Sequence, residues 1–256
     1  MDCLVKINNV TAIIQARTGS TRFPNKVFAV LCDKPIIWHI VDRVRSCKNV
    51  GNIVLATTLN SSDDTLKRWG KENNVLVYCG SENDVLDRFY NAALISNAEV
   101  ILRITADDPF RDPVIIDSVI NLLFDKKLDF AYNNKPPTFP EGLDVEVFTF
   151  SALELAQNES RDAFEREHVT QYFYRHPEKF KQENFSNNKN LSYLRLTIDT
   201  EKDLEMAKIL YEELYRQGEI FLLSDIMELI KEKPWIANIN NNVKRSAMYS
   251  GVNKKG

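Results

Sequence analysis

Short apolar runs alternate with longer amphipathic stretches through the first two-thirds of this 256-residue chain. The runs are typical of strands buried on both faces of a parallel sheet, and they lie at residues 11–15, 53–57, 75–78 and 99–104. Between and after them, apolar residues recur at helical spacing, at residues 35–45, 63–73, 84–96 and 113–124. Because strands that alternate with helices form βαβ units, the sequence predicts an α/β fold with a doubly wound, mostly parallel sheet.

The pattern changes in residues 133–192, which we interpret as an inserted antiparallel hairpin and helix lobe. Residues 144–150 alternate polar with apolar side chains, which predicts a half-exposed antiparallel strand. Helices are expected to begin at Ser151 and at Asp162, the second reaching about His176.

The last part of the chain returns to the first pattern. A buried strand is expected at residues 193–198, and Thr200 with Asp203 has the spacing of a capping box at the start of a long helix. A last helix is expected from Ser224. With 44% hydrophobic and 27% charged residues the composition is globular, so we expect one domain. Its expected bounds are residues 1–236, with a loose tail at residues 237–256.

Charge is distributed unevenly in a chain whose formal net charge is −3. This balance argues against general nucleic-acid binding, which usually requires a basic domain. Between Asp2 and Asp33, however, no acid interrupts a group of bases: Lys6, Arg17, Arg22 and Lys26. A basic island on a mildly acidic protein indicates one anion-binding site.

Cysteine usage and hydropathy point to a cytoplasmic protein. The four cysteines have no CxxC spacing, which is typical of reduced thiols. No apolar stretch approaches the roughly 18 residues needed to span a bilayer, and the first residues lack the pattern of a signal peptide. We therefore expect a soluble, cytoplasmic protein without membrane insertion.

Familiar short motifs are absent from the sequence. The eight glycines form no GxGxxG and no P-loop, and neither HExxH nor GxSxG occurs. The basic loop after the first predicted strand, QARTGSTRFPNK at residues 15–26, is instead the strongest candidate site. Loops at the carboxyl end of a parallel strand are where ligands of such folds collect, although a solvated basic loop is the alternative. Gly19 would permit a positive φ and a close backbone approach to a phosphate.

This loop and five later motifs resemble a known enzyme family. IIQARTGSTRFPNK is similar to the signature loop of the sugar nucleotidyltransferase superfamily, in particular the spore-coat polysaccharide type of cytidylyltransferase, related to CMP-KDO and CMP-sialic acid synthetases. Further matches follow in order over about residues 11–215: DVLDRFYNAA, RITADDPFRDP, GLDVEVF, EREHVTQYF and RLTIDTEKDLE. Asp108 departs from the spore-coat type, which usually has cysteine there, whereas the KDO type has an acid.

The resemblance implies a Rossmann-like nucleotide-diphospho-sugar transferase fold and a Mg²⁺- or Mn²⁺-dependent reaction. An acceptor oxygen of a sugar or sugar acid would attack the α-phosphorus of CTP and release pyrophosphate, for polysaccharide biosynthesis. Positioning and neutralisation of charge dominate such a transfer. A homodimer is implied as well.

The resemblance also implies roles for particular residues. Catalytic roles are expected for Arg17, Lys26 and Asp107, and metal ligation for Asp107 and Asp199. The expected nucleotide-binding residues are Ala16, Arg17, Thr18, Gly19, Ser20, Arg22, Lys26, Gly80, Asp84 and Arg88. Asp107 could instead start a turn, and Asp84 and Asp199 could be acids at helix N-termini.

Acceptor-binding residues are expected in the inserted lobe. Asp144 and Glu146 would share one strand face, and Glu165 and His168 one helix face. The alternative is that these residues only form an exposed strand face and a packed histidine, and it is at least as consistent with the sequence. Two other functions stay open: a glycosyltransferase of the same fold, which would usually have a DxD motif that this sequence lacks, and a non-catalytic nucleotide-binding protein.

Overall fold

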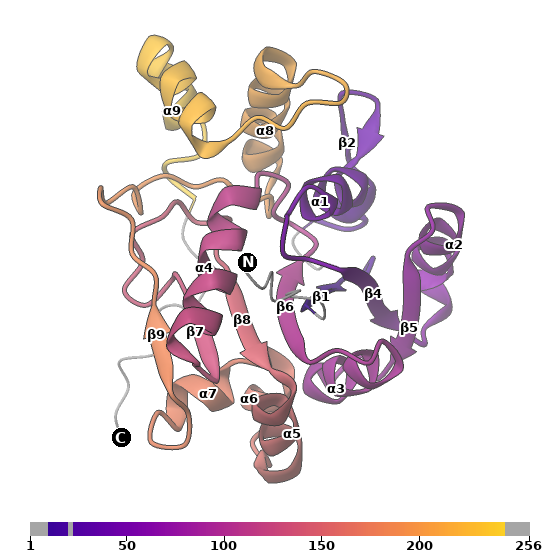
Figure 1. Ribbon diagram of the computed structural model, residues 1–256. Helices are drawn as coiled ribbons and strands as arrows, with labels where there is room; N and C mark the ends of the chain where they lie inside the picture. Colours follow the sequence, from indigo (N-terminus) through magenta and orange to yellow (C-terminus); the bar gives the residue numbers. More distant parts are fainter. Residues whose placement is uncertain (1–9, 20–22, 244–256) are drawn as a thin grey trace, which may run out of the picture.

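A central mixed sheet organises the chain, of which a computed structural model describes residues 10–19 and 23–243. Within those residues the sheet has seven strands in the order β5-β4-β1-β6-β8-β7-β9 (Figure 1). Four neighbouring strands run parallel, as the apolar runs predict: β1 (Val10–Gln15), β4 (Asn52–Thr58), β5 (Leu76–Gly80) and β6 (Val100–Thr105). The doubly wound, mostly parallel sheet is thus confirmed.

The other half of the sheet comes from later segments. Strand β8 (Glu146–Thr149) pairs antiparallel with both β6 and β7 (Phe130–Tyr132), and β9 (Gln182–Asn184) pairs parallel with β7. Residues 133–192 therefore add strands to the main sheet. A separate small ribbon joins β2 (Val30–Leu31) to β3 (Lys34–Pro35).

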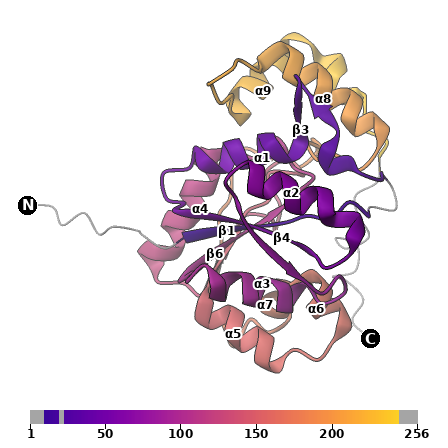
Figure 2. The same cartoon turned by 90° about the vertical axis from the view of Figure 1, so that its right-hand side faces the viewer.

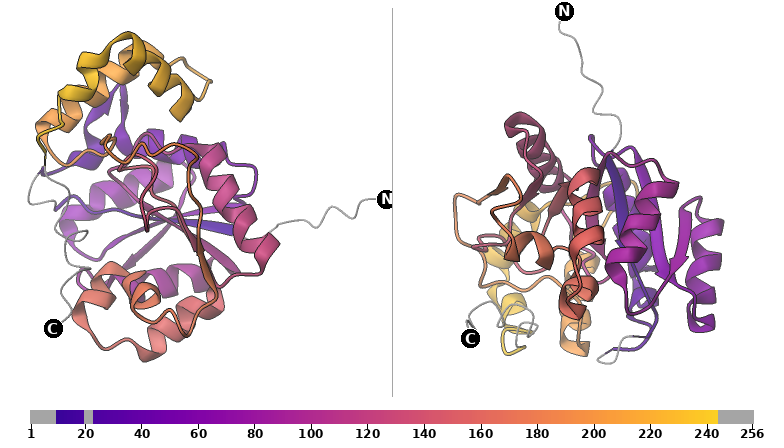
Figure 3. Two further views of the ribbon diagram at one scale, coloured as in Figure 1. Left: turned by 90° about the vertical axis from the view of Figure 1, so that its left-hand side faces the viewer. Right: turned by 90° about the horizontal axis from the view of Figure 1, so that it is seen from below.

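Helices cover both faces of the sheet (Figure 2). One side carries α1 (Ile36–Arg45), α2 (Asp64–Glu72) and α4 (Pro113–Lys126), with α8 (Glu201–Leu214) and α9 (Leu223–Glu232) outside α1. The opposite side carries α3 (Val85–Ile95), α5 (Phe150–Glu159), α6 (Ala163–His168) and α7 (Gln171–Arg175). Figure 3 shows the same two layers from further directions. Each layer encloses its own apolar core against the sheet. No helix in the described part of the chain is long and apolar enough to cross a membrane.

Three local expectations are wrong. Residues 193–198 form no regular strand, because their buried backbone pairs with loops: Leu196 N donates to Glu141 O (2.7 Å) and Ile198 N to Asp107 O (2.9 Å). Strand β8 is buried on both faces, since Val147 packs into the apolar core on one side of the sheet and Phe148 into the core on the other. The helix expected to run from Asp162 to about His176 breaks into α6 and α7 at Val169, whose φ is +48°.

The expected loose tail does not begin at residue 237. A 3₁₀ helix spans Pro234–Asn238, and the following Asn240 is 2% exposed and hydrogen-bonded into the domain.

Stability is expected to fall between pH 7 and pH 5 because of His39. This side chain is 2% exposed between α1 and α8, its Nε2–H donates to Leu31 O (2.7 Å), and its ring packs on Tyr211 and Tyr215. Burial disfavours the charged ring and lowers the pKa of His39 from 6.5 to about 4. The unfolded chain therefore binds a proton below pH 6.5 that the folded chain resists until about pH 4. Acid within this window favours unfolding, by about 2 kcal/mol at pH 5.

Urea unfolding of the wild-type and His39→Gln proteins at pH 7 and pH 5 measures this effect. Glutamine keeps a donor near Leu31 but does not titrate, so the stability difference between the two pH values shrinks by about 2 kcal/mol. An unchanged pH difference in His39→Gln would contradict this assignment.

Candidate active site

The carboxyl ends of the four parallel strands carry most of the expected site residues. The loop at residues 16–19 follows β1, Asp63 follows β4, Asp84 follows β5 and Asp107 follows β6. Parallel strands bring these loops to one edge of the sheet, the usual ligand-binding position in open α/β folds.

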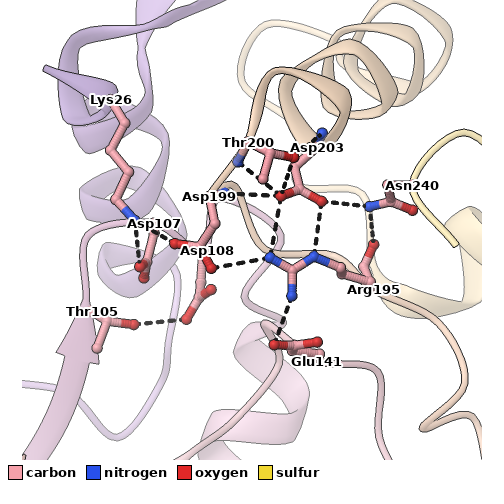
Figure 4. A network of polar contacts seen from close by, with 10 residues as sticks. All are labelled: Lys26, Thr105, Asp107, Asp108, Glu141, Arg195, Asp199, Thr200, Asp203 and Asn240. Atoms are coloured by element: carbon pink, nitrogen blue, oxygen red, sulfur yellow. Dashed lines mark hydrogen bonds and ion pairs between the residues drawn. The ribbon is translucent and has the colours of Figure 1, made fainter. Parts of the chain in front are cut away.

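Lys26 joins the two aspartates expected to hold a metal. Its Nζ lies 2.8 Å from Asp107 Oδ2 and 2.8 Å from Asp199 Oδ1, so the structure brings all three together from distant parts of the sequence (Figure 4). The Lys26 side chain is 13% exposed, that of Asp107 26% and that of Asp199 8%. The cluster is therefore shielded, and Asp107 is its most accessible carboxylate.

Opposite charges keep Lys26 and Asp107 ionised despite their burial. Burial by itself would lower the pKa of Lys26, but the charges and hydrogen bonds of Asp107 and Asp199 outweigh it and raise that pKa. Burial would likewise raise the pKa of Asp107, but the neighbouring Lys26 ammonium lowers it. Each group thus holds its partner in the charged form.

Asp108 faces another set of partners. Its Oδ2 accepts from Thr105 Oγ1 (2.7 Å) and from Arg111 Nη2 (2.6 Å). Burial and then the charge of Asp107 raise the pKa of Asp108 to about 7, despite the opposing charge of Arg111. Arg111, which no pattern in the sequence singles out, also donates to the carbonyl of Asp144 and so ties that residue to Asp108.

Arg195 fixes Asp199 from the side opposite Lys26. Its Nη2 donates to Asp199 Oδ2 (3.0 Å), its Nε to Asp203 Oδ1 (2.9 Å), and Nη1 lies 2.8 Å from Glu141 Oε1 (Figure 4). Gly142, with φ +97°, allows the neighbouring segment to approach, since a Cβ there would lie 2.5 Å from Leu196 O. The sequence places Arg195 in the RLTIDTEKDLE motif, and the structure shows which acids it pairs with.

The basic loop is held by a residue that sequence reasoning did not single out. The buried Asp63 accepts from Thr18 N (2.8 Å) and Thr18 Oγ1 (2.7 Å) through one carboxylate oxygen. The exposed Arg17 pairs with Glu82 (2.9 Å), while Ala16 is buried. Asn25, with φ +58°, has the left-handed backbone that Gly19 was expected to supply; Gly19 is not among the positive-φ glycines. Ser20 and Arg22 lie outside the described residues.

In the segment after β5, the residues expected to bind the nucleotide make contacts within the protein. Asp84 caps α3 by accepting from Asp87 N (3.0 Å) and pairs with Arg166 (2.7 Å), which favours the helix-terminus reading. Arg88 is buried and donates to Ser81 O (2.6 Å). Gly80 ends β5 so close to Arg88 that a Cβ would lie 3.2 Å from its Cγ. These residues shape the loop that borders the site.

The four residues expected to bind the acceptor each have different surroundings and do not form one group. Glu146 is buried and pairs with Arg103 (2.6 Å), while Glu165 is buried and bonded to Ser160 (3.0 Å). Asp144 precedes β8, so the expected shared strand face does not form. His168 is half-buried, and burial lowers its pKa. The glutamates therefore have clear packing roles, and Asp144 is the most accessible of the carboxylates.

Comparisons of the sequence and of the structure with known proteins point to the same family. The profile of the family described as "Cytidylyltransferase" matches residues 11–246. The spore coat polysaccharide biosynthesis protein SpsF of Bacillus subtilis is 32% identical over 235 residues, covering 89% of this chain and 96% of that protein. A cytidylyltransferase structure from Leptospira borgpetersenii superposes with a TM-score of 0.86 at 35% identity, covering 93% of this chain and 99% of that one.

A more distant structure supports the fold alone. A CMP-2-keto-3-deoxy-manno-octonic acid synthetase solved with CTP has a TM-score of 0.60 at 15% identity, covering 81% of this chain and all of that one. The Rossmann-like nucleotidyltransferase architecture is thus common to both chains.

Proposed function

This chain belongs to the cytidylyltransferase family and is a nucleotidyltransferase, and we propose that it transfers CMP from CTP to a sugar or sugar acid. The product would serve surface polysaccharide or glycan synthesis, in line with the name of the Bacillus subtilis relative, a spore coat polysaccharide biosynthesis protein. The observation that carries the proposal is the contact of Lys26 with both Asp107 and Asp199 at the ligand-binding edge of the sheet.

The proposed reaction exchanges one phosphorus–oxygen bond for another. An acceptor oxygen forms a bond to the α-phosphorus of CTP, and the bond from that phosphorus to the bridging oxygen breaks. Pyrophosphate leaves with the electron pair, and the acceptor proton passes to solvent or a nearby base. Lys26 and Arg17 offset the negative charge of the phosphates, and the Thr18 turn fixes their loop.

The residues around Lys26 fit a magnesium ion. Among the described residues, the contact network of Figure 4 together with Arg111 has five carboxylates, Asp107, Asp108, Glu141, Asp199 and Asp203, and three cations, Lys26, Arg111 and Arg195. Carboxylates outnumber cations in this network, and carboxylate oxygens are the ligands that a hard divalent cation prefers. No group of three or more His, Cys, Asp or Glu in the described chain forms a metal-binding cluster, and Mg²⁺ typically takes one or two carboxylates plus substrate phosphates.

We propose that Asp107 and Asp199 hold Mg²⁺ or Mn²⁺ together with the nucleotide. The bound ion would neutralise phosphate charge and orient the phosphates. Lys26 then supplies a further cation beside the same carboxylates.

A pyrophosphate-release assay tests the proposed function. It crosses ATP, CTP, GTP and UTP with a panel of sugars that includes nonulosonic and octulosonic acids. Release that requires CTP, Mg²⁺ and an acceptor supports the proposal. Binding of CTP without release in any mixture would indicate a nucleotide-binding protein, and turnover of a nucleotide sugar without CTP consumption a glycosyltransferase. Homodimer formation and cytoplasmic location stay predictions.

Asp144→Asn is expected to raise the acceptor KM about tenfold and leave CTP affinity unchanged. Asp144 is half-buried beside the Asp108 turn, because Arg111 holds its backbone, and a lost charged hydrogen bond to an acceptor hydroxyl has about this effect. Steady-state kinetics measure both constants. Glu183→Gln, at an exposed glutamate paired with Lys126, is the control. Weaker CTP binding with an unchanged acceptor KM would remove Asp144 from the acceptor site.

A further inference from the structure

Asp199 is held between two cations that contact different oxygens. Lys26 Nζ contacts Oδ1, whereas Arg195 Nη2 donates to Oδ2 (3.0 Å). With Oδ2 engaged by Arg195, Oδ1 faces Lys26 and Asp107 (Figure 4). The orientation of Asp199 therefore depends on where Arg195 is fixed.

Arg195 is fixed by Asp203, which is fully buried at the start of α8. Asp203 accepts from Arg195 Nε (2.9 Å) and Nη2 (3.2 Å), and its Oδ2 also accepts from the backbone N–H of Asp199 (3.0 Å) and Thr200 (2.9 Å). Burial would raise the pKa of Asp203, but the Arg195 hydrogen bonds lower it. One carboxylate thus holds both the guanidinium and the backbone of Asp199.

Asn240 completes the arrangement from beyond the last helix. Its side-chain Nδ2 donates to Asp203 Oδ1 (2.9 Å) and to the carbonyl of Arg195 (3.1 Å). The residue is buried and uncharged, so it joins the two partners without altering the charge of the cluster. Asn240 is 41 positions beyond Asp199 in the sequence, yet it hydrogen-bonds to both Arg195 and Asp203, which orient Asp199.

We propose that Arg195, Asp203 and Asn240 are positioning residues that present Asp199 Oδ1 to the divalent cation bound with the nucleotide. The inference rests on the proposed function, because it concerns the proposed metal site. Hydrogen-bond partners of metal ligands typically change metal affinity by 10–100-fold when replaced. The C-terminal segment around Asn240 is thereby part of the active-site support.

The test measures Mn²⁺ binding by electron paramagnetic resonance, with a non-hydrolysable CTP analogue and no turnover. Asn240→Ala is expected to weaken Mn²⁺ binding about tenfold. Arg195→Lys is expected to weaken it at least as much, since a single ammonium cannot reproduce the three separate nitrogens with which Arg195 contacts Glu141, Asp199 and Asp203. The matched control is Asn241→Ala, because the adjacent Asn241 is exposed and its side chain bonds Asn238. This control should bind Mn²⁺ as the wild type does.

Thermal unfolding of each protein separates positioning from folding. Weakened Mn²⁺ binding at a temperature where the Asn240→Ala protein is folded supports the proposal. Wild-type Mn²⁺ affinity in Asn240→Ala, even with a lower Tm, overturns it. A wild-type protein that binds CTP analogue but no Mn²⁺ would overturn the metal site of the proposed function, and this inference with it. If Arg195→Lys does not fold, Asn240→Ala alone decides.

Discussion

Lys26→Ala is expected to lower turnover by about 10²–10³-fold, the scale for losing one preorganised charge contact. The Lys26 ammonium lies 2.8 Å from a carboxylate oxygen of both Asp107 and Asp199. Alanine leaves these two acids without the cation between them and removes a counter-charge to the phosphates. Pyrophosphate release under saturating CTP, Mg²⁺ and acceptor measures the effect. Near-wild-type release would refute the assignment of the site.

The same variant should shift the acid limb of the pH profile. In the wild type the Lys26 charge counters burial and lowers the pKa of Asp107. Without that charge, burial raises the pKa, so ionised Asp107 is lost at a higher pH and the acid limb of kcat moves upward. Lys67→Ala is the matched control, because Lys67 also pairs with an aspartate at 2.8 Å, but on the surface at Asp64. Its turnover and pH profile should equal those of the wild type.

Asp107→Asn should also lower turnover by about 10²–10³-fold, with smaller changes in CTP binding. Asparagine keeps the size of the side chain but loses the charge that pairs with Lys26 and that would ligate the metal. Because Asp107 is the more accessible of the two proposed ligands, its replacement should leave the fold intact. Higher Mg²⁺ should restore part of the lost rate if metal binding is the cause.

A control at another aspartate separates this effect from a general loss of charge. Asp117 in α4 accepts from the backbone N–H of Lys48 (2.9 Å) and Asn49 (3.0 Å), in the loop that precedes β4 and not in one of the loops that follow the parallel strands. Asp117→Asn should change the Tm slightly and leave kcat unchanged. Wild-type turnover of Asp107→Asn at limiting Mg²⁺ would show that Asp107 has no role in the reaction.

The repeating pattern of apolar residues was sufficient for most of the fold. Strands β1, β4, β5 and β6 follow from short continuous apolar runs, and the helices between them follow from apolar residues spaced three to four apart. The capping box at Thr200 and Asp203 also forms as expected, since its partners are three residues apart. Strands β7 and β9 were missed, because each is only three residues long and its burial depends on distant neighbours.

The candidate site likewise depends partly on local sequence and partly on long-range packing. The sequence determined the residue types, with Lys26 in a basic loop and Asp107 and Asp199 after apolar runs. The long-range contacts follow from the packed fold: Arg195 holds Asp199, Asp63 holds Thr18, and Asn240 bonds both Arg195 and Asp203. Local patterns arise from backbone geometry that repeats every few residues. Contacts between side chains far apart in the chain depend on how whole layers pack, and no short pattern carries that information.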